Sequence, residues 1–151
     1  MATVIKLDNA YIGTDIFKPK IQKCLDRLSK EAAQYKTWLD TYNLSIRPAA
    51  HSGANFKDDA IDIARATFDA SETWLASVII HEAIHFWQYR SGKYKAGSEA
   101  ESEANKYQLA VLRHLKAPQS EITHMLSQTG GHADINGDGV YDWKDYNARK
   151  Y

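Results

Sequence analysis

The sequence predicts an α+β fold that is mainly helical and carries a small β-sheet. Three observations lead to this prediction: a long amphipathic helical pattern after Pro19, two short extended segments at residues 44–49 and 60–67, and an apolar helical segment at residues 74–87. With 151 residues, the chain is long enough for one domain with a buried core. We therefore expect a single helical domain with a small appendage.

The first helix is predicted from the spacing of apolar residues after Pro19, which suits the first turn of a helix because proline lacks a backbone N–H. The opposite face is charged and is expected to be solvated. Before this helix, residues 4–17 alternate only weakly and are consistent with a short strand or an irregular cover. The apolar positions of the helix recur at intervals of four and three residues: Ile21, Leu25, Leu28, Ala32, Tyr35, Leu39 and Tyr42.

Two extended segments are predicted between this helix and the next. Pro48 excludes a continuous helix in residues 44–49, and residues 60–67 alternate between apolar and polar side chains. We expect them to form a hairpin or a small sheet, joined by a polar loop. His51 in that loop is a candidate metal ligand, although a single histidine on a polar loop is more commonly just exposed.

Three further helices are predicted in the second half of the chain. Ser71 is a candidate N-cap for the first of them, which ends after Arg90 because Gly92 follows. This helix is apolar on nearly all sides, so we expect it to be central and buried. A second helix is predicted over residues 98–116 and a short third one over residues 120–127.

The central helix contains the pattern His81-Glu82-x-x-His85. Side chains four residues apart share one face of a helix, so the two imidazoles can bind one metal ion. Glu82 then lies beside the metal, where a general base can take a proton from metal-bound water. The alternative is that both histidines are ordinary buried residues, but burying two imidazoles and a carboxylate is costly without a partner such as a metal.

A catalytic zinc site usually has three protein ligands, and the following helix offers Glu99, Glu101 and Glu103. Helical phase selects Glu101, which falls within the apolar face of that helix, whereas Glu103 lies at its rim and Glu99 on the far side. A competing explanation is a capping box, in which Glu101 only reaches back to the amide of Ser98. We favour Glu101 as the third ligand because a two-histidine site precedes it.

These residues resemble a known family. His81-Glu82-Ala83-Ile84-His85 followed by Glu101-x-x-Ala104-Asn105 is similar to the gluzincin zinc metallopeptidases, in particular compact members such as the minigluzincins. The likeness covers about residues 60–115 and implies a zincin-like domain with an active-site helix and a third-ligand helix. It also implies that Asn105 supports a zinc-bound histidine, most simply His81.

The resemblance further implies a mechanism. Zinc would activate a water molecule, Glu82 would act as the general base, and a nearby donor would stabilise the oxyanion. The family uses a Tyr or His as this donor, and Tyr94, His114 and His124 are the candidates here. The strand before the active-site helix, within residues 60–67, would form the upper edge of the cleft and pair with an extended peptide by strand addition.

The C-terminal tail, residues 130–151, is expected to be distinct from the domain of residues 1–129. It fits a twelve-residue calcium loop, with Gly at the sharp turn and a carboxylate at position twelve. The sequence resembles a dockerin loop or a single EF-hand, although a metal-free turn would favour the same residues. The expected calcium ligands are Asp134, Asn136, Asp138, Val140 and Asp145.

The composition limits the partners and the location. The formal net charge is +0, so nucleic acid and anionic membranes are not expected as partners, and Cys24 is the single cysteine, which excludes an internal disulfide. No signal peptide or membrane-spanning run is recognisable. We expect synthesis in the cytoplasm, and the calcium loop suggests action outside the cell or in the periplasm.

The sequence therefore predicts a zinc-dependent peptidase of gluzincin type, stabilised or regulated by calcium, with Zn²⁺ and Ca²⁺ as cofactors. A protein or peptide is the expected substrate, and an inhibitor or immunity protein is a candidate partner. A secreted effector, a toxin or a phage-borne protein would fit the small size and the tail. Two alternatives stay open: a calcium-dependent binding module with structural zinc, and a zinc amidase that acts on cell-wall material.

Overall fold

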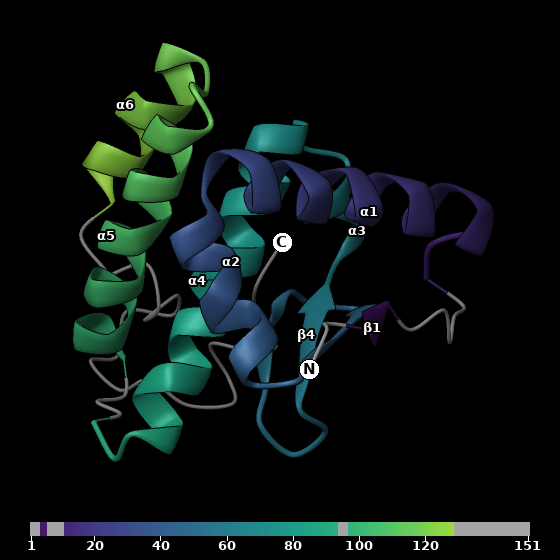
Figure 1. The fold of residues 1–151 in the computed structure, drawn as a ribbon, viewed down its shortest axis with the longest axis horizontal. Coiled ribbons are helices and arrows are strands. Elements are labelled where there is room, and N and C mark those ends of the chain that lie inside the picture. Colours follow the sequence, from purple (N-terminus) through teal and green to yellow (C-terminus); the bar gives the residue numbers. More distant parts are fainter. Residues whose placement is uncertain (1–3, 6–10, 94–96, 129–151) are drawn as a thin grey trace.

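The structure is a computed structural model that describes residues 4–5, 11–93 and 97–128. It confirms an α+β architecture that is mainly helical with a small sheet (Figure 1). The strands are β1 (Val4–Ile5), β2 (Ser45–Pro48), β3 (Gly53–Asn55) and β4 (Ala60–Ile63). The helices are α1 (Thr14–Glu31), α2 (Ala33–Thr41), α3 (Arg65–Phe68), α4 (Glu72–Arg90), α5 (Ser98–His114) and α6 (Gln119–Ser127). The predicted calcium loop and Tyr94 lie outside the described residues, and the division at residue 129 stays a prediction.

The sheet has the strand order β1-β2-β4-β3, in which β1, β2 and β4 are parallel and β3 is antiparallel to β4. Ile61 of β4 is paired with Ile46 on one side and Ala54 on the other, so β4 is an inner strand. The prediction that residues 60–67 form the edge of the cleft is therefore wrong. Only Ala60–Ile63 is extended, and among the described strands the outer position beyond β4 belongs to β3.

The burial of β4 explains this difference. All four of its residues are buried, including Asp62, whose carboxylate accepts a hydrogen bond from Arg47 Nε at 2.6 Å. Alternation of apolar and polar side chains is typical of a strand with one solvated face, but the polar side chain of Asp62 is buried and satisfied by an ion pair with the neighbouring strand. After Ile63, the chain turns into the short helix α3, which leads to α4.

The first predicted helix is two helices in the structure. α1 already begins at Thr14, with Pro19 inside it, and the chain breaks at Ala32, where φ is −145° and ψ is 45°. The predicted start at Pro19 and the continuous helix to Tyr42 are therefore wrong. The break turns α2 toward α4, where the ring of Trp38 packs 5.6 Å from that of Trp87 between centroids.

α4 is the central helix of the fold and packs against α5, α1 and α2. In Figure 1 it lies behind α2, between α5 on the left and the sheet on the right. Its ends agree with the prediction: Ser71 Oγ accepts a hydrogen bond from the amide of Trp74 at 3.1 Å, and Gly92 follows the last turn with φ at 73°. Glycine suits that left-handed conformation because it has no Cβ to clash with the backbone.

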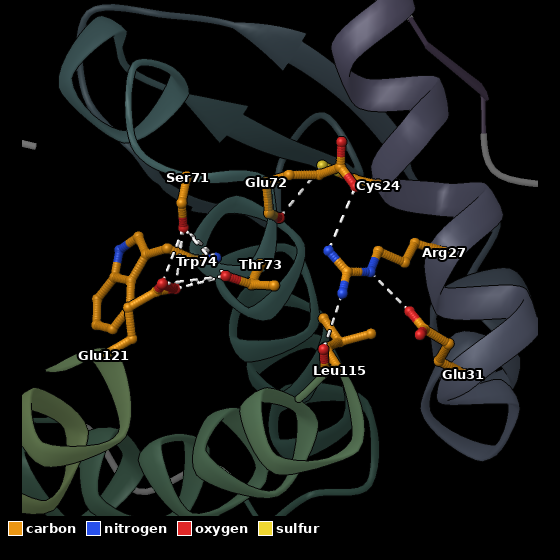
Figure 2. A network of polar contacts seen from close by, with 9 residues as sticks. All are labelled: Cys24, Arg27, Glu31, Ser71, Glu72, Thr73, Trp74, Leu115 and Glu121. Carbon is orange, nitrogen blue, oxygen red and sulfur yellow. Dashed lines mark hydrogen bonds and ion pairs between the residues drawn. The ribbon is translucent and has the colours of Figure 1, made fainter. Parts of the chain in front are cut away.

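Polar contacts hold α1, α5 and α6 around the first turn of α4 (Figure 2). Arg27 of α1 donates to the carbonyl oxygen of Leu115 at 2.8 Å and forms an ion pair with Glu72 at 3.5 Å. Glu121 of α6 accepts hydrogen bonds from the hydroxyls of Ser71 and Thr73, at distances of 2.9 and 2.6 Å. These contacts fix α6 beside the N-terminal half of α4. Within the described parts of the chain, no helix is both long and apolar enough to cross a membrane.

Candidate metal centre

The two histidines of α4 and one carboxylate of α5 meet in a buried cluster. Nε2 of His81 lies 3.2 Å from Nε2 of His85, and the Glu101 carboxylate oxygens lie 3.0 Å and 3.1 Å from these two nitrogens. The three residues are 6–7% exposed. Their possible ligand atoms all lie within 4.8 Å of one another. The structure therefore brings together the three residues that the sequence predicted as ligands.

The donor set fits a divalent metal ion. Two imidazole nitrogens and one carboxylate oxygen are the ligands of many catalytic zinc sites. Burial lowers the pKa of His85, but the hydrogen bond and charge of Glu101, with smaller contributions from Glu82 and Gln88, raise it from 6.5 to about 9. The carboxylates around His85 thus stabilise a positive charge in the cluster. Either a proton on the imidazole or a bound metal cation can supply this charge.

The other two glutamates of the α5 N-terminus have different positions. Glu99 is exposed, and Glu103 accepts a hydrogen bond from Gln88 Nε2 at 2.9 Å. The capping box is not formed, because the N-cap of α5 is Gly97 and no side chain caps this end. Glu101 is therefore available to the histidines, as its position on the apolar face of the helix predicted.

Asn105 lies on α5 four residues after Glu101 and is 8% exposed. The predicted hydrogen bond to His81 is not made in the structure. Both the amide nitrogen of Asn105 and Nδ1 of His81 are buried without a hydrogen-bond partner among the described residues. Asn105 instead lines the pocket beside the cluster, with its amide nitrogen unsatisfied. Its role as a supporting residue stays a prediction.

Gln88 was missed by the sequence reasoning. Its Oε1 lies 2.8 Å from Nδ1 of His85, and its Nε2 donates to the carbonyl oxygen of Ala100 at 3.0 Å. Its position three residues after His85 places it on the same face of α4, which was a signal in the sequence. The partners on α5 had no such signal, because they come from a different helix.

A pocket of about 570 Å³ opens beside the cluster. Glu82, which is 7% exposed, lines it together with His81 and Glu101. The pocket follows α4 from these residues past Val78 and Trp74 to its first turn, and its walls are mostly apolar. Val78 and Trp74 on α4 and its N-cap Ser71 precede His81 at intervals of about one helical turn. The pocket therefore extends about three turns beyond the metal ligands.

The three candidate oxyanion donors differ in position. His124 lines the pocket, and its ring packs 5.3 Å from that of Trp74 between centroids. His114 instead packs against Tyr35 at 5.5 Å and is not part of the pocket lining. Tyr94 lies outside the described residues. His51 is half-buried in its loop and does not belong to the metal-ligand group found among the described residues.

Comparisons of the chain with protein-family models, with curated proteins and with solved structures find no match. The resemblance to gluzincin peptidases therefore depends on the motif residues alone.

Proposed function

We propose that the protein is a zinc-dependent peptidase whose metal ligands are His81, His85 and Glu101. The observation that carries this proposal is the convergence of three buried donor atoms from α4 and α5 at one wall of a large pocket. A structural zinc site usually has four protein ligands, whereas a catalytic site has three and keeps one position open. Three ligands beside a pocket favour the catalytic kind.

Glu82 is the proposed general base. A bound zinc ion would act as a Lewis acid and lower the pKa of the water molecule that attacks the peptide bond. Glu82 lies next to His81 in the sequence and lines the pocket, so its carboxylate can accept the proton of the attacking water. It then donates this proton to the leaving amine. Among the described donor candidates, His124 is the one in the pocket lining that can stabilise the oxyanion.

The shape of the site supports an extended peptide as the substrate. Ser52, immediately before the edge strand β3, lines the same pocket as Glu82. Among the described residues, β3 has a partner strand only on the β4 side, so its other edge can pair with an extended chain. The proposed strand addition therefore moves from residues 60–67 to β3 (Gly53–Asn55). The apolar walls of the pocket suit an apolar side chain next to the scissile bond.

The experiment is a comparison of wild type with Glu82→Gln, both loaded with zinc, on an unfolded protein and on a peptide library. We expect Glu82→Gln to keep one zinc per chain and to lose at least about 10²-fold in kcat, which is the low end for loss of a general base. The exposed Glu99→Gln is the control for removal of a nearby charge. Equal cleavage by wild type and Glu82→Gln would contradict the proposal.

Two other functions make different predictions for the same samples. A binding module with structural zinc would hold the metal and cleave nothing. A zinc amidase that acts on cell-wall material would degrade peptidoglycan fragments but not unfolded protein. Calcium dependence of the activity and delivery as an effector, toxin or phage-borne protein remain parts of the proposal that depend on the tail, residues 130–151.

A further inference from the structure

We infer that Gln88 is a positioning residue of the metal centre, which sets the tautomer of His85 and ties the two ligand-bearing helices together. This inference rests on the proposed function, since it assigns a role toward the same metal. Gln88 is 1% exposed and lies between α4 and α5. One end of its side-chain amide forms a hydrogen bond with His85 on α4, and the other end forms one with Ala100 on α5.

The orientation of the amide follows from its partners on α5. One end of the Gln88 amide lies 3.0 Å from the carbonyl oxygen of Ala100 and 2.9 Å from Oε1 of Glu103. A backbone carbonyl oxygen, such as that of Ala100, can only accept hydrogen bonds. The end that faces it must therefore be the NH₂ group, and the carbonyl end must face His85.

The orientation of the amide then sets the proton on His85. The Gln88 Oε1 atom lies 2.8 Å from Nδ1 of His85 and can only accept, so Nδ1 carries a proton. In a neutral ring the lone pair is then on Nε2. That atom is the one that lies 3.1 Å from Glu101 Oε1 and 3.2 Å from His81 Nε2. Gln88 thus directs the lone pair of His85 to the metal position.

The same hydrogen bonds hold the third ligand in place. Ala100, whose carbonyl oxygen accepts from Gln88, is the residue before Glu101. The contact therefore fixes the first turn of α5 relative to His85. His81 has no equivalent support, because its Nδ1 is without a partner among the described residues. The side chain of Gln88 therefore links His85 on α4 to the first turn of α5.

Gln88 is not in a position to touch a substrate. It does not line the pocket that contains Glu82 but lines a second pocket of about 790 Å³, together with Glu103 and Lys93. Its effect on a reaction would thus be exerted through His85. Residues that support metal ligands in this way typically change metal affinity by about 10–100-fold when they are replaced.

The test measures zinc affinity by competition with a chelator for wild type and for variants of the full chain. We expect Gln88→Met to bind zinc about 10–100-fold more weakly than wild type. Gln88→Glu keeps an acceptor for His85 but places a second carboxylate beside Glu103, so we expect weak binding again. Adding Glu103→Gln to Gln88→Glu removes the second carboxylate and restores a donor between the two side chains. Because the carbonyl oxygen of Ala100 then still faces a carboxylate, the affinity should recover in part, to a value between those of Gln88→Glu and wild type.

Two controls separate this role from a general loss of structure. Gln108→Met replaces another buried glutamine, whose amide donates to Ser77 Oγ at 3.1 Å and not to a metal ligand, and it should leave zinc affinity unchanged. In zinc-loaded wild type, two-bond ¹H–¹⁵N spectra should show His85 bound through Nε2 and protonated at Nδ1. This second measurement needs no variant.

The outcomes distinguish this inference from the proposed function. Coordination of His85 through Nδ1, or wild-type zinc affinity in Gln88→Met, would overturn the inference while a zinc-dependent, Glu82-dependent cleavage could still stand. A double variant as weak as Gln88→Glu alone would also count against it. If wild type binds no zinc, the inference and the proposed function fail together.

Discussion

The carboxylate of Glu101 on α5 lies 3.0 Å from Nε2 of His81 on α4, although the two residues are 20 positions apart in the sequence. This contact makes a three-donor site out of a two-histidine motif. It depends on the packing of α5 along α4, which is the most extensive helix contact of the fold. The sequence predicted which glutamate would face the histidines, and the packing brings it to them.

Replacement of Glu101 should remove most of the zinc affinity. In Glu101→Ala the cluster keeps only the two imidazoles as ligands. We therefore expect zinc affinity to fall by more than the roughly 10–100-fold that is typical when a supporting residue is replaced. Isothermal titration with zinc measures this, and Glu99→Ala on the exposed side of α5 is the control. Full affinity in Glu101→Ala would remove Glu101 from the ligand set.

A charge at Val78 should impair substrate binding without affecting the metal. Val78 lines the pocket one turn before His81, so Val78→Asp places a carboxylate where we propose that an apolar side chain binds. We expect KM for apolar peptides to rise about 10-fold or more, with zinc content unchanged. Val78→Thr, which has nearly the same shape, should have a smaller effect. Equal KM values for both variants and wild type would show that substrate does not reach this wall.

Cys24 should be unreactive in the folded protein. The side chain is 0% exposed, and burial, followed by the charge of Glu72, raises its thiol pKa from 9.0 to about 12. At pH 8 the reactive thiolate is therefore suppressed, and labelling with a disulfide reagent should require unfolding. Denaturant-dependent labelling measures this. Fast labelling under native conditions would mean that the contact between α1 and the first turn of α4 is open.

The C-terminal loop should bind one calcium ion per chain. Asp134 is the first predicted ligand, so Asp134→Ala should abolish calcium binding while zinc binding stays intact. Calorimetric titration with calcium in the presence of saturating zinc separates the two metals. Calcium binding that persists in Asp134→Ala would show that the loop is not the site.

Local patterns predicted the helices of the second half of the chain, α4, α5 and α6, well. The N-cap Ser71, the end of α4 before Gly92 and the position of Glu101 follow from caps, turns and helical phase, which depend on residues within a few positions of one another. The break at Ala32 had no such signal, because the apolar spacing continues through it. The break accompanies the packing of α2 against α4.

The parts that the sequence did not predict depend on contacts between distant segments. The inner position of β4 is decided by its pairing with both β2 and β3, and alternation alone does not specify partners. Gln88 follows His85 by three residues, which places both on one face of α4. Its function becomes recognisable only from its hydrogen bonds to Ala100 and Glu103 on α5. The missing bond between Asn105 and His81 was likewise a matter of side-chain placement.

The central claim is that two histidines and one glutamate bind zinc and leave a position open for water. X-ray absorption at the zinc edge of the loaded protein tests it most directly. We predict two imidazole nitrogens at about 2.0–2.1 Å and two further oxygen neighbours, one from Glu101 and one from water. Absence of stoichiometric zinc from the folded protein, or a zinc shell without the imidazole signature, would contradict the account.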